Sequence, residues 1–338
     1  MKLSVTIPCR NEVLYIEECI EALYACELPA DTSMQVFVVD GMSDDGTREL
    51  VTSLTENYDE LHLVDNVKQL TPFAFNLGIY AGGKVDYVQI VGARHILSKN
   101  YLMQCIERLQ SDTSCWCVGG RIQNEYINFE GEIISRAMET AFGMGIGNFR
   151  VLKKSGYTDT LTSPMYPYWV FEKIGFFDKE LTRNQDDEFN FRVTQAGGKI
   201  YFEHEISLKY YVRGTFKGLK RQFFQYGYWK VYVNKKHKAV TTLRQLLPPL
   251  FVLYLFTIPL SLLFGSLGSV VYTIPLVLYA GLLILFSVKG ARTAIEFFKL
   301  IRTYIILHVQ YGLGYVLGII HFLFLNRKPS GNQNRLSR

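Results

Sequence analysis

Short apolar runs alternate with longer amphipathic stretches through the first 206 residues of the chain. The run at 3–7 is rich in β-branched residues and predicts a buried strand, whereas the stretch at 12–24 has helical periodicity. The same rhythm repeats at 34–39 and 47–55. It predicts an α/β domain with a mostly parallel sheet, in which ligands bind beyond the carboxyl ends of the strands. The loops to consider first follow Ile7, Val39 and Val91.

The last third of the chain has a different pattern, because after Leu246 charged residues are absent over long stretches. Residues 246–264 and 269–288 are uncharged runs of about 20 residues, long enough to cross a bilayer of about 30 Å as helices. We expect both to span the membrane. A third run, 303–325, carries two histidines and a glutamine, and is expected either to span or to re-enter the bilayer.

Charge placement orients these segments. Basic residues follow the second span at Lys289, Arg292, Lys299 and Arg302. The positive-inside rule therefore predicts that the catalytic domain and this connection both lie in the cytoplasm. Basic and aromatic residues interleave at 209–245, which favours interfacial helices on an anionic leaflet over a solvated basic face. The predicted organisation is a domain at 1–208, interfacial helices at 209–245, a membrane domain at 246–326 and a basic tail at 327–338.

Composition supports a cytoplasmic catalytic domain. The six cysteines lie in the N-terminal part without metal-type pairing, and the first residues form a β-type run rather than an export signal. A net charge of +5 on 338 residues is modest, and we expect no nucleic-acid partner. Gly314 and Gly318 form a GxxxG pair, from which association of the chain into a homo-oligomer through its membrane helices is a weak expectation.

A series of motifs follows in a fixed order along the chain. They are Ile7–Glu12 (IPCRNE), Val38–Thr47 (VVDGMSDDGT), Phe75–Gly78 with Ala81–Gly83, Phe171–Asp178, Arg183–Arg192 (RNQDDEFNFR) and Gln222–Gly227. Between Lys2 and about Lys230 the chain resembles the family 2 glycosyltransferases, especially the bacterial branch that builds exopolysaccharides. The resemblance implies a GT-A (Rossmann-like) fold, followed here by interfacial and transmembrane helices. It also implies a bacterial inner-membrane enzyme with several membrane passes, active in exopolysaccharide, capsule or other cell-envelope synthesis.

The resemblance also implies the nucleotide pocket, with Pro8, Glu12 and Asp40 around the base and ribose. The full predicted donor set is Pro8, Arg10, Glu12, Asp40, Ser43, Lys68, Asn76, Arg94 and Arg150. A carboxylate at a strand end can accept hydrogen bonds from a ribose or a base edge. Taken without its partners, the Asp40 loop is an Asp, Ser and Gly turn that caps a helix.

Asp186 aligns with the aspartate of the family's Glu-Asp motif, which implies that it is the general base of an inverting transfer. Such a transfer needs a carboxylate that takes the proton of the acceptor hydroxyl. Asp187 and Glu188 would tend to raise its pKa, and Arg183 and Arg192 could oppose that shift. The alternative is a solvated acidic helix N-terminus. Predicted acceptor-side residues are Asp187, Gln222, Gln225 and Trp229, although Trp229 is equally suited to anchor a helix at the interface.

The metal motif of the family is replaced. Relatives hold a divalent cation with Asp-x-Asp or Asp-x-His, whereas this chain has Gly92, Ala93 and Arg94 at that place. Arg94, with Lys68 or Arg150, could neutralise the diphosphate directly. Alternatively Mg²⁺ or Mn²⁺ binds through the substrate and another carboxylate, or activity is lost. We favour weakened or absent metal dependence, and we assign no residue of this chain as a metal ligand.

Two further expectations complete the analysis. Ser163-Pro164 stands where relatives usually have a glycine, which predicts a reshaped acceptor loop. The predicted partners are a nucleotide-sugar donor, a lipid-linked or polysaccharide acceptor, and membrane lipids. One alternative function is a catalytically inactive membrane scaffold, which the replaced metal motif favours. A small transporter is disfavoured, because the spans are few and carry no charged pair.

Overall fold

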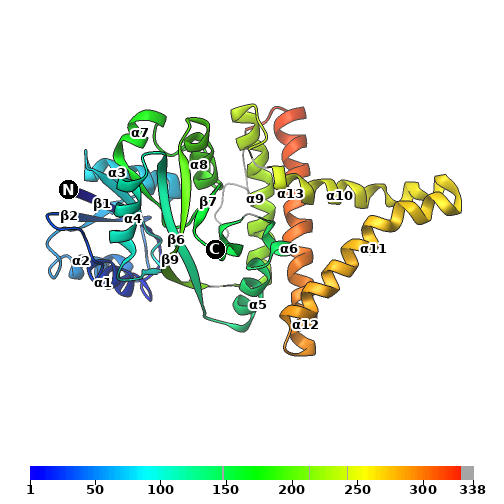
Figure 1. The fold of residues 1–338 in the computed structure, drawn as a ribbon, viewed down its shortest axis with the longest axis horizontal. Coiled ribbons are helices and arrows are strands. Elements are labelled where there is room, and N and C mark those ends of the chain that lie inside the picture. Colours follow the sequence, from blue (N-terminus) through cyan, green and yellow to red (C-terminus); the bar gives the residue numbers. More distant parts are fainter. Residues whose placement is uncertain (147, 213, 242, 329–338) are drawn as a thin grey trace. The chain divides into compact units, whose positions relative to one another are not determined.

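The computed structural model describes residues 1–146, 148–212, 214–241 and 243–328 (Figure 1). The chain forms two compact units, and each unit combines two separate segments of sequence. The first unit comprises Met1–Glu125 and Gly147–Tyr211, and the second Tyr126–Ile146 and Val212–Arg338. The boundary predicted at 208 is close to the second junction. The placement of 126–146 in the second unit differs from the prediction of one continuous catalytic segment. Most of the predicted tail, and Arg213, lie outside the described residues.

Within the described residues, a nine-stranded mixed sheet forms the centre of the first unit. Its strands are β1 (Lys2–Cys9), β2 (Ser33–Asp40), β3 (Leu61–Asp65), β4 (Tyr87–Ile90), β5 (His95–Leu97), β6 (Cys115–Tyr126), β7 (Gly156–Thr158), β8 (Met165–Pro167) and β9 (Lys199–Val212). Their order is β3-β2-β1-β4-β8-β6-β9-β5, with β7 paired to β9. The first four of these run parallel, and β8 is antiparallel to β4. The predicted α/β fold is confirmed, with antiparallel strands added on one side.

Helices cover both faces of this sheet. They are α1 (Ile16–Tyr24), α2 (Thr47–Leu54), α3 (Thr71–Gly82), α4 (Tyr101–Ser111), α7 (Tyr168–Ile174) and α8 (Gln185–Gln195), with the short helix η1 (Phe149–Val151). Alternate residues of β2 show the two faces, since Val36 and Val38 join a core with α1, α2 and α4, whereas Phe37 and Val39 pack with Ala74 of α3. Period-two alternation therefore separates the two hydrophobic cores.

The second unit consists of helices. They are α5 (Phe129–Met138), α6 (Ala141–Met144), α9 (Phe216–His237), η2 (Leu243–Leu246), α10 (Leu247–Thr257), η3 (Ile258–Phe264), α11 (Gly265–Gly290), α12 (Ala294–Ile305), η4 (Ile306–Gln310), α13 (Tyr311–Gly318) and η5 (Ile319–Phe324). Three helical segments are long and apolar enough to cross a membrane, namely Leu243–Ser261, Leu267–Gly290 and Ala294–Phe324. The third begins earlier than predicted, because α12 to η5 follow one another directly. Of the two predicted alternatives, spanning or re-entering the bilayer, the length of this segment is sufficient for spanning.

Helices α9 and α13 approach each other through glycines. A Cβ atom built at Gly314 would lie 2.0 Å from the carbonyl oxygen of Phe224, and one at Gly227 would lie 2.0 Å from that of Tyr311. At Gly318 the same atom would lie 2.9 Å from the carbonyl oxygen of Tyr228. The GxxxG pair thus packs within one chain. The pair is therefore engaged in packing α13 against α9, and both a homo-oligomer and the interfacial position of α9 stay predictions.

A charged cluster joins α5 to the start of α12. Arg136 of α5 contacts Glu296 of α12 at 2.9 Å, and it donates a 2.8 Å hydrogen bond to the carbonyl oxygen of Gly290. Arg292 lies 3.5 Å from Glu132 of α5. Sequence positions about 150 residues apart are therefore tied together, which explains why 126–146 belongs to this unit.

Candidate active site

Two loops at the carboxyl ends of β1 and β2 are fixed to each other. The backbone N–H of Asn11 donates to Ser43 Oγ at 2.8 Å, and Asn11 Nδ2 donates to Asp44 Oδ1 at 2.7 Å. The backbone N–H of Glu12 donates to Thr47 Oγ1 at 2.9 Å. Parallel strands bring these loops to one edge of the sheet, which is where a nucleotide binds in folds of this type. The two predicted donor motifs therefore form one surface.

Asp40 is completely buried beneath this surface. Its Oδ2 accepts from the backbone N–H of Ser43 at 2.9 Å and pairs with Arg48 at 2.8 Å, while the Ser43 hydroxyl donates to Oδ1. Arg48 also reaches Asp65 at 2.7 Å and so joins the ends of β2 and β3. Asp40 and Ser43 thus hold the loop itself. A nucleoside that contacts Asp40 must rearrange these partners, and its direct role stays a prediction.

Glu12 and Arg94 form a two-point ion pair. Arg94 Nε lies 2.6 Å from Glu12 Oε2, its second donor lies 3.0 Å from Oε1, and both side chains are mostly buried. The guanidinium carbon is 5.0 Å from the centre of the Tyr15 ring. The charge of Arg94 is therefore neutralised inside the protein. This arrangement differs from the prediction that Arg94 grips the diphosphate and that Glu12 contacts the nucleoside.

At the replaced metal motif, an imidazole ring covers Gly92. A Cβ atom at Gly92 would lie 2.8 Å from His95 Cε1, so a side chain at this position would displace the ring. His95 Nδ1 lies 3.2 Å from the backbone nitrogen of Gly92 and 2.6 Å from Ser163 Oγ. Ser163 has a φ of +43°, a conformation that favours glycine. His95 therefore contacts both Gly92, which stands at the predicted metal motif, and Ser163.

The tautomer of His95 follows from these contacts. A backbone N–H can only donate, so Nδ1 is an acceptor, Ser163 donates its hydroxyl, and the ring proton lies on Nε2. Nε2 has no hydrogen-bond partner among the described residues, and it is not one of their buried unpaired atoms. Sequence reasoning assigned His95 no role. Two sequence features could have predicted a role for His95. It lies three residues after Gly92, and serine stands at position 163 where a glycine was expected.

The stability of the first unit is expected to fall as the pH falls from about 6.5 toward 3, in part because of His95. Burial, and then the charge of Arg150, lower the pKa of His95 from 6.5 to about 3. The folded state thus keeps the ring neutral, whereas the unfolded chain takes up a proton below pH 6.5. The measurement is the thermal midpoint of the purified protein across this pH range.

His95→Gln removes the titrating group and should flatten that part of the pH dependence, although its stability at neutral pH is expected to be lower. His62→Gln is the matched control, since the His62 side chain is 44% exposed. Equal pH slopes for His95→Gln and the parent protein would show that His95 is not the responsible group.

Asn76 has a structural role. Its Nδ2 donates to the carbonyl oxygen of Phe177 at 2.8 Å, and its Oδ1 accepts from the N–H of Phe177 at 3.0 Å. The side chain is 1% exposed. This pairing holds α3 to the segment after α7 and differs from the predicted nucleotide contact, because both ends of the amide are engaged.

The remaining predicted donor residues lie around the same edge. Pro8 is part of β1 and pairs with Val39. The side chain of Arg10 lies over Gly41, with its Cβ 3.2 Å from the position that a Gly41 Cβ would take. Lys68 is exposed after β3, and Arg150 lies in η1, close enough to affect the pKa of His95. Lys68 and Arg150 therefore lie outside the Glu12–Arg94 ion pair, and their contacts with the donor stay predictions.

Asp186 is exposed in the first turn of α8. Asn184 precedes the helix with φ +60°, which turns the chain into it. Burial first, and then charge at neighbours that include Asp186, keep the pKa of the Tyr166 phenol in β8 well above its usual range. Asp186 therefore lies near the strand that follows Ser163. An exposed carboxylate at a helix N-terminus is stabilised in its charged form, which is the form that a general base requires.

The acids after Asp186 have different surroundings. Asp187 is half-buried, whereas Glu188 is buried and pairs with Arg192 at 2.8 Å. Arg192 also donates to the carbonyl oxygens of Ile174 at 2.6 Å and Phe176 at 2.9 Å. Arg192 was expected to oppose the effect of the neighbouring acids on Asp186. In the structure it pairs with one of these acids, Glu188. This pair joins α8 to the end of α7 and fixes the start of α8.

The predicted acceptor residues Gln222, Gln225 and Trp229 belong to α9 in the second unit. Gln222 Nε2 donates to the Tyr226 hydroxyl at 2.8 Å, and Gln225 is buried. Trp229 is 1% exposed and packs edge-on to Tyr232. Its indole therefore presents no open face, either for sugar stacking or as an interfacial anchor. The acceptor roles of Gln222 and Gln225 stay predictions.

The Ser163-Pro164 segment is likewise internal. Ser163 is 4% exposed, and its carbonyl oxygen accepts from Gln89 Nε2 at 2.7 Å and from the Tyr101 hydroxyl at 3.0 Å. The carbonyl oxygen of Pro164 accepts from the N–H of Ile90 at 3.0 Å. These bonds continue the pairing of β8 with β4. The segment is therefore part of the sheet, which differs from the predicted acceptor loop.

The residues at the replaced motif do not fit a divalent cation. Mg²⁺ and Mn²⁺ prefer carboxylate and carbonyl oxygens, whereas this place offers a glycine, an alanine, a paired arginine and a histidine whose Nδ1 is engaged. Among the described residues, no group of three or more His, Cys, Asp or Glu side chains could hold a metal. The resident groups therefore do not provide the ion site that the resemblance implies.

A mixed α/β sheet with linked loops at the carboxyl ends of β1 and β2, and an exposed acid in the first turn of α8, fits a glycosyltransferase with a GT-A fold. The family model "Glycosyl transferase family 2" matches residues 4–175, and the chain belongs to this family. The predicted family and fold are thereby confirmed as those of a nucleotide-sugar transferase, and the described residues include three helices able to cross a membrane.

Individual relatives agree with this family. The chain is 27% identical to succinoglycan biosynthesis protein ExoA of Rhizobium meliloti over 72% of this chain and 73% of that protein. It is 28% identical to the dolichyl N-acetyl-alpha-D-glucosaminyl phosphate 3-beta-D-2,3-diacetamido-2,3-dideoxy-beta-D-glucuronosyltransferase of Methanococcus voltae, over 67% and 71%. Among solved structures, the mannosyltransferase PcManGT of Pyrobaculum calidifontis, in complex with GDP-Man and Mn²⁺, matches with a TM-score of 0.61 and 17% identity, over 92% and 86%. The candidate spans among the described residues indicate a membrane protein.

Proposed function

We propose that this glycosyltransferase moves a sugar from a nucleotide diphosphate to a lipid-linked glycan with inversion at the anomeric carbon. The setting that we propose is bacterial exopolysaccharide or envelope synthesis at the inner membrane, with the catalytic unit in the cytoplasm. The observation that carries the proposal is the exposed Asp186 carboxylate beside a neighbouring acid, Glu188, that is buried and neutralised. We assign the exposed acid to the chemistry, whereas the buried acid pairs with Arg192 and holds the helix.

In the proposed reaction, Asp186 accepts the proton of the acceptor hydroxyl as that oxygen attacks the anomeric carbon. The new carbon–oxygen bond forms on the face opposite the diphosphate, and the bond to the diphosphate oxygen breaks. The nucleoside diphosphate leaves with the bonding electrons, so its negative charge must be stabilised. Arg150, and the Nε2–H donor of His95, are the groups of the replaced motif region that we assign to this task.

The lipid-linked acceptor is supported by the spans and by one relative. The Methanococcus voltae enzyme is named for a dolichyl-linked sugar phosphate, and PcManGT binds a nucleotide sugar. Three helices that can cross a membrane would keep the chain beside a lipid acceptor. Basic residues after the second span support the cytoplasmic orientation.

The test is a thermal-shift screen of the solubilised full chain against UDP-, GDP- and dTDP-sugars, followed by assay of sugar-nucleotide hydrolysis. A ligand that binds only the folded state raises the midpoint, so one class of donor should stand out. The inactive-scaffold alternative predicts no hydrolysis of any donor. Selective stabilisation with measurable hydrolysis would exclude it.

Chelation is expected to change the transfer rate by less than about twofold, because the protein offers no carboxylate at the replaced motif. The rate should be measured in excess EDTA and again after Mn²⁺ or Mg²⁺ is added. A family member with an intact Asp-x-Asp motif serves as the positive control. Loss of activity in chelator and its recovery with either ion would contradict the expectation.

A further inference from the structure

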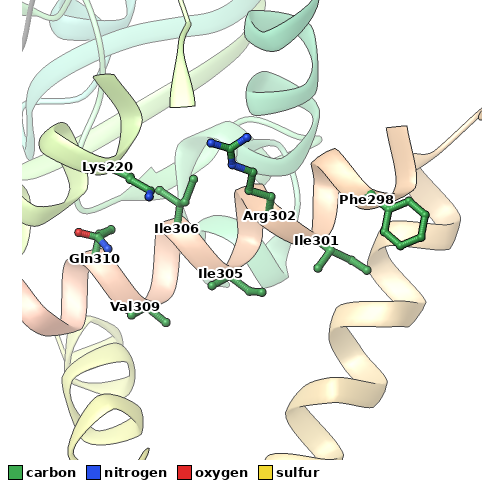
Figure 2. A pocket seen from close by; sticks show the side chains of 8 residues that line it. All are labelled: Lys220, Phe298, Ile301, Arg302, Ile305, Ile306, Val309 and Gln310. Carbon is green, nitrogen blue, oxygen red and sulfur yellow. The ribbon is translucent and has the colours of Figure 1, made fainter. Parts of the chain in front are cut away.

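A groove in the second unit is apolar along most of its length and basic at one side. It is lined by residues of α9, α12 and the π-helical η4, and has a volume of about 330 Å³ (Figure 2). Lys220 comes from α9, and Arg302, Ile305 and Val309 come from the continuous α12–η4 segment. The groove therefore lies on a helix that is long enough to span the membrane.

Its two cations are available for an anion. Lys220 and Arg302 are both exposed, and neither pairs with a carboxylate among the described residues. Neighbouring Lys299, in contrast, lies 3.9 Å from Glu130. The guanidinium carbon of Arg302 is 4.2 Å from the centre of the Phe216 ring, which orients it. Two exposed cations beside an apolar surface, one of them oriented by an aromatic ring, favour a phosphate group.

The apolar part of the groove continues along one face of the helix. Ile301, Ile305 and Val309 follow one another at intervals of four residues, and Figure 2 shows all three on the same side of the helix. At a rise of about 1.5 Å per residue, this apolar stripe is about 12 Å long. Ile305 is 40% exposed although it is apolar. This surface suits a hydrocarbon chain that continues from a bound phosphate.

The backbone changes within the apolar stripe. Residues Ile306–Gln310 form a π-helical segment, which is rare and is frequent at functional sites. Gln310 contributes an amide to the groove lining at the far end of this segment. An irregular backbone beside two unneutralised cations is a combination that packing of the helices alone does not require.

We propose that this groove binds the phosphate and the first part of the chain of the acceptor lipid, a phosphate ester of a long isoprenoid alcohol. The phosphate contacts Lys220 and Arg302, and the chain lies along Ile305 and Val309. The assignment rests on the proposed transfer to a lipid-linked acceptor. A single chain fits the volume of the groove, whereas an ordinary membrane phospholipid carries two.

The first experiment locates the lipid. The full chain in nanodiscs of neutral phosphatidylcholine is photolabelled with a diazirine-bearing geranylgeranyl phosphate, and labelled peptides are identified by mass spectrometry. We expect label in 298–310, and competition by geranylgeranyl phosphate but not by the alcohol, inorganic phosphate or phosphatidic acid. Label elsewhere overturns the assignment. Equal competition by phosphatidic acid also overturns it, because the groove would then be a general acidic-phospholipid site.

The second experiment removes the cations. Lys220→Gln and Arg302→Gln should each weaken competition, and raise the KM for the lipid acceptor, by about tenfold. Lys289→Gln is the matched control, because Lys289 is an exposed basic residue at the end of α11 that does not line the groove. Unchanged competition and KM in both groove variants would contradict the proposal.

The two proposals can fail separately. The groove variants should keep donor hydrolysis to water and the thermal shift caused by the donor, since no step of donor binding is assigned to them. If the parent protein transfers no sugar yet is labelled in the groove, the proposed function is wrong and the lipid site stands. If both groove variants transfer normally, the lipid site is wrong and the proposed function stands.

Discussion

Replacing Asp186 by asparagine is expected to lower the rate of sugar transfer by about a hundredfold or more, the usual contribution of a general base. The amide has nearly the same shape but cannot take the acceptor proton. Because Asp186 is exposed in the first turn of α8, the fold is expected to tolerate its replacement. Donor binding, measured by thermal shift, should therefore remain.

Asp187→Asn is the matched control, since Asp187 is the adjacent acid of the same turn. It should reduce transfer less than Asp186→Asn does. Full activity of Asp186→Asn together with an inactive Asp187→Asn would move the base to position 187. Full activity of both would remove the acid from the mechanism. Each rate should be compared with the thermal midpoint of the same preparation, so that unfolding is not read as lost catalysis.

Gly314→Ala is expected to destabilise the second unit by several kcal/mol, at the upper end of the cost of overpacking. Its Cβ would lie 2.0 Å from the carbonyl oxygen of Phe224, which is backbone and cannot rotate away. The helices α13 and α9 must therefore separate. The measurement is the thermal midpoint of the solubilised protein, followed by the fraction that stays monodisperse on size exclusion.

Gly281→Ala provides the comparison within the same unit. Gly281 lies in α11, and a Cβ atom there would meet nothing within 4 Å. Alanine favours helix by about 1 kcal/mol over glycine, so this variant should be as stable as the parent protein or slightly more so. Equal midpoints for the two variants would show that α13 and α9 are not held at this close distance.

The sequence predicted features that depend on local periodicity. The alternation of Val36 and Val38 with Phe37 and Val39 identified a strand, and the uncharged runs identified spans by length alone. The third span was left open, because His308, Gln310 and His321 made its path ambiguous. Its helix also begins at Ala294, before the charge-free part of the sequence starts.

Features that depend on long-range pairing were not predictable in the same way. Glu12 and Arg94 are 82 residues apart, and each was assigned to the ligand because each type of side chain can bind one. Asn76 was assigned to the ligand for the same reason, although in the structure its amide bonds a backbone group 101 residues away. A polar side chain near a strand end indicates a binding site. Only tertiary packing decides whether its hydrogen-bonding groups are already paired with another part of the chain.

The ties between α5 and α12 bear on how the enzyme can be produced. A chain truncated before Arg292 would retain Arg136 while losing Glu296, its carboxylate partner at 2.9 Å. It would also lose the helix against which the buried side of α5 packs. Ending the gene at the apparent limit of the catalytic region should therefore give an aggregation-prone product. During translation, about 150 further residues must be synthesised after α5 before the residues that it contacts are present.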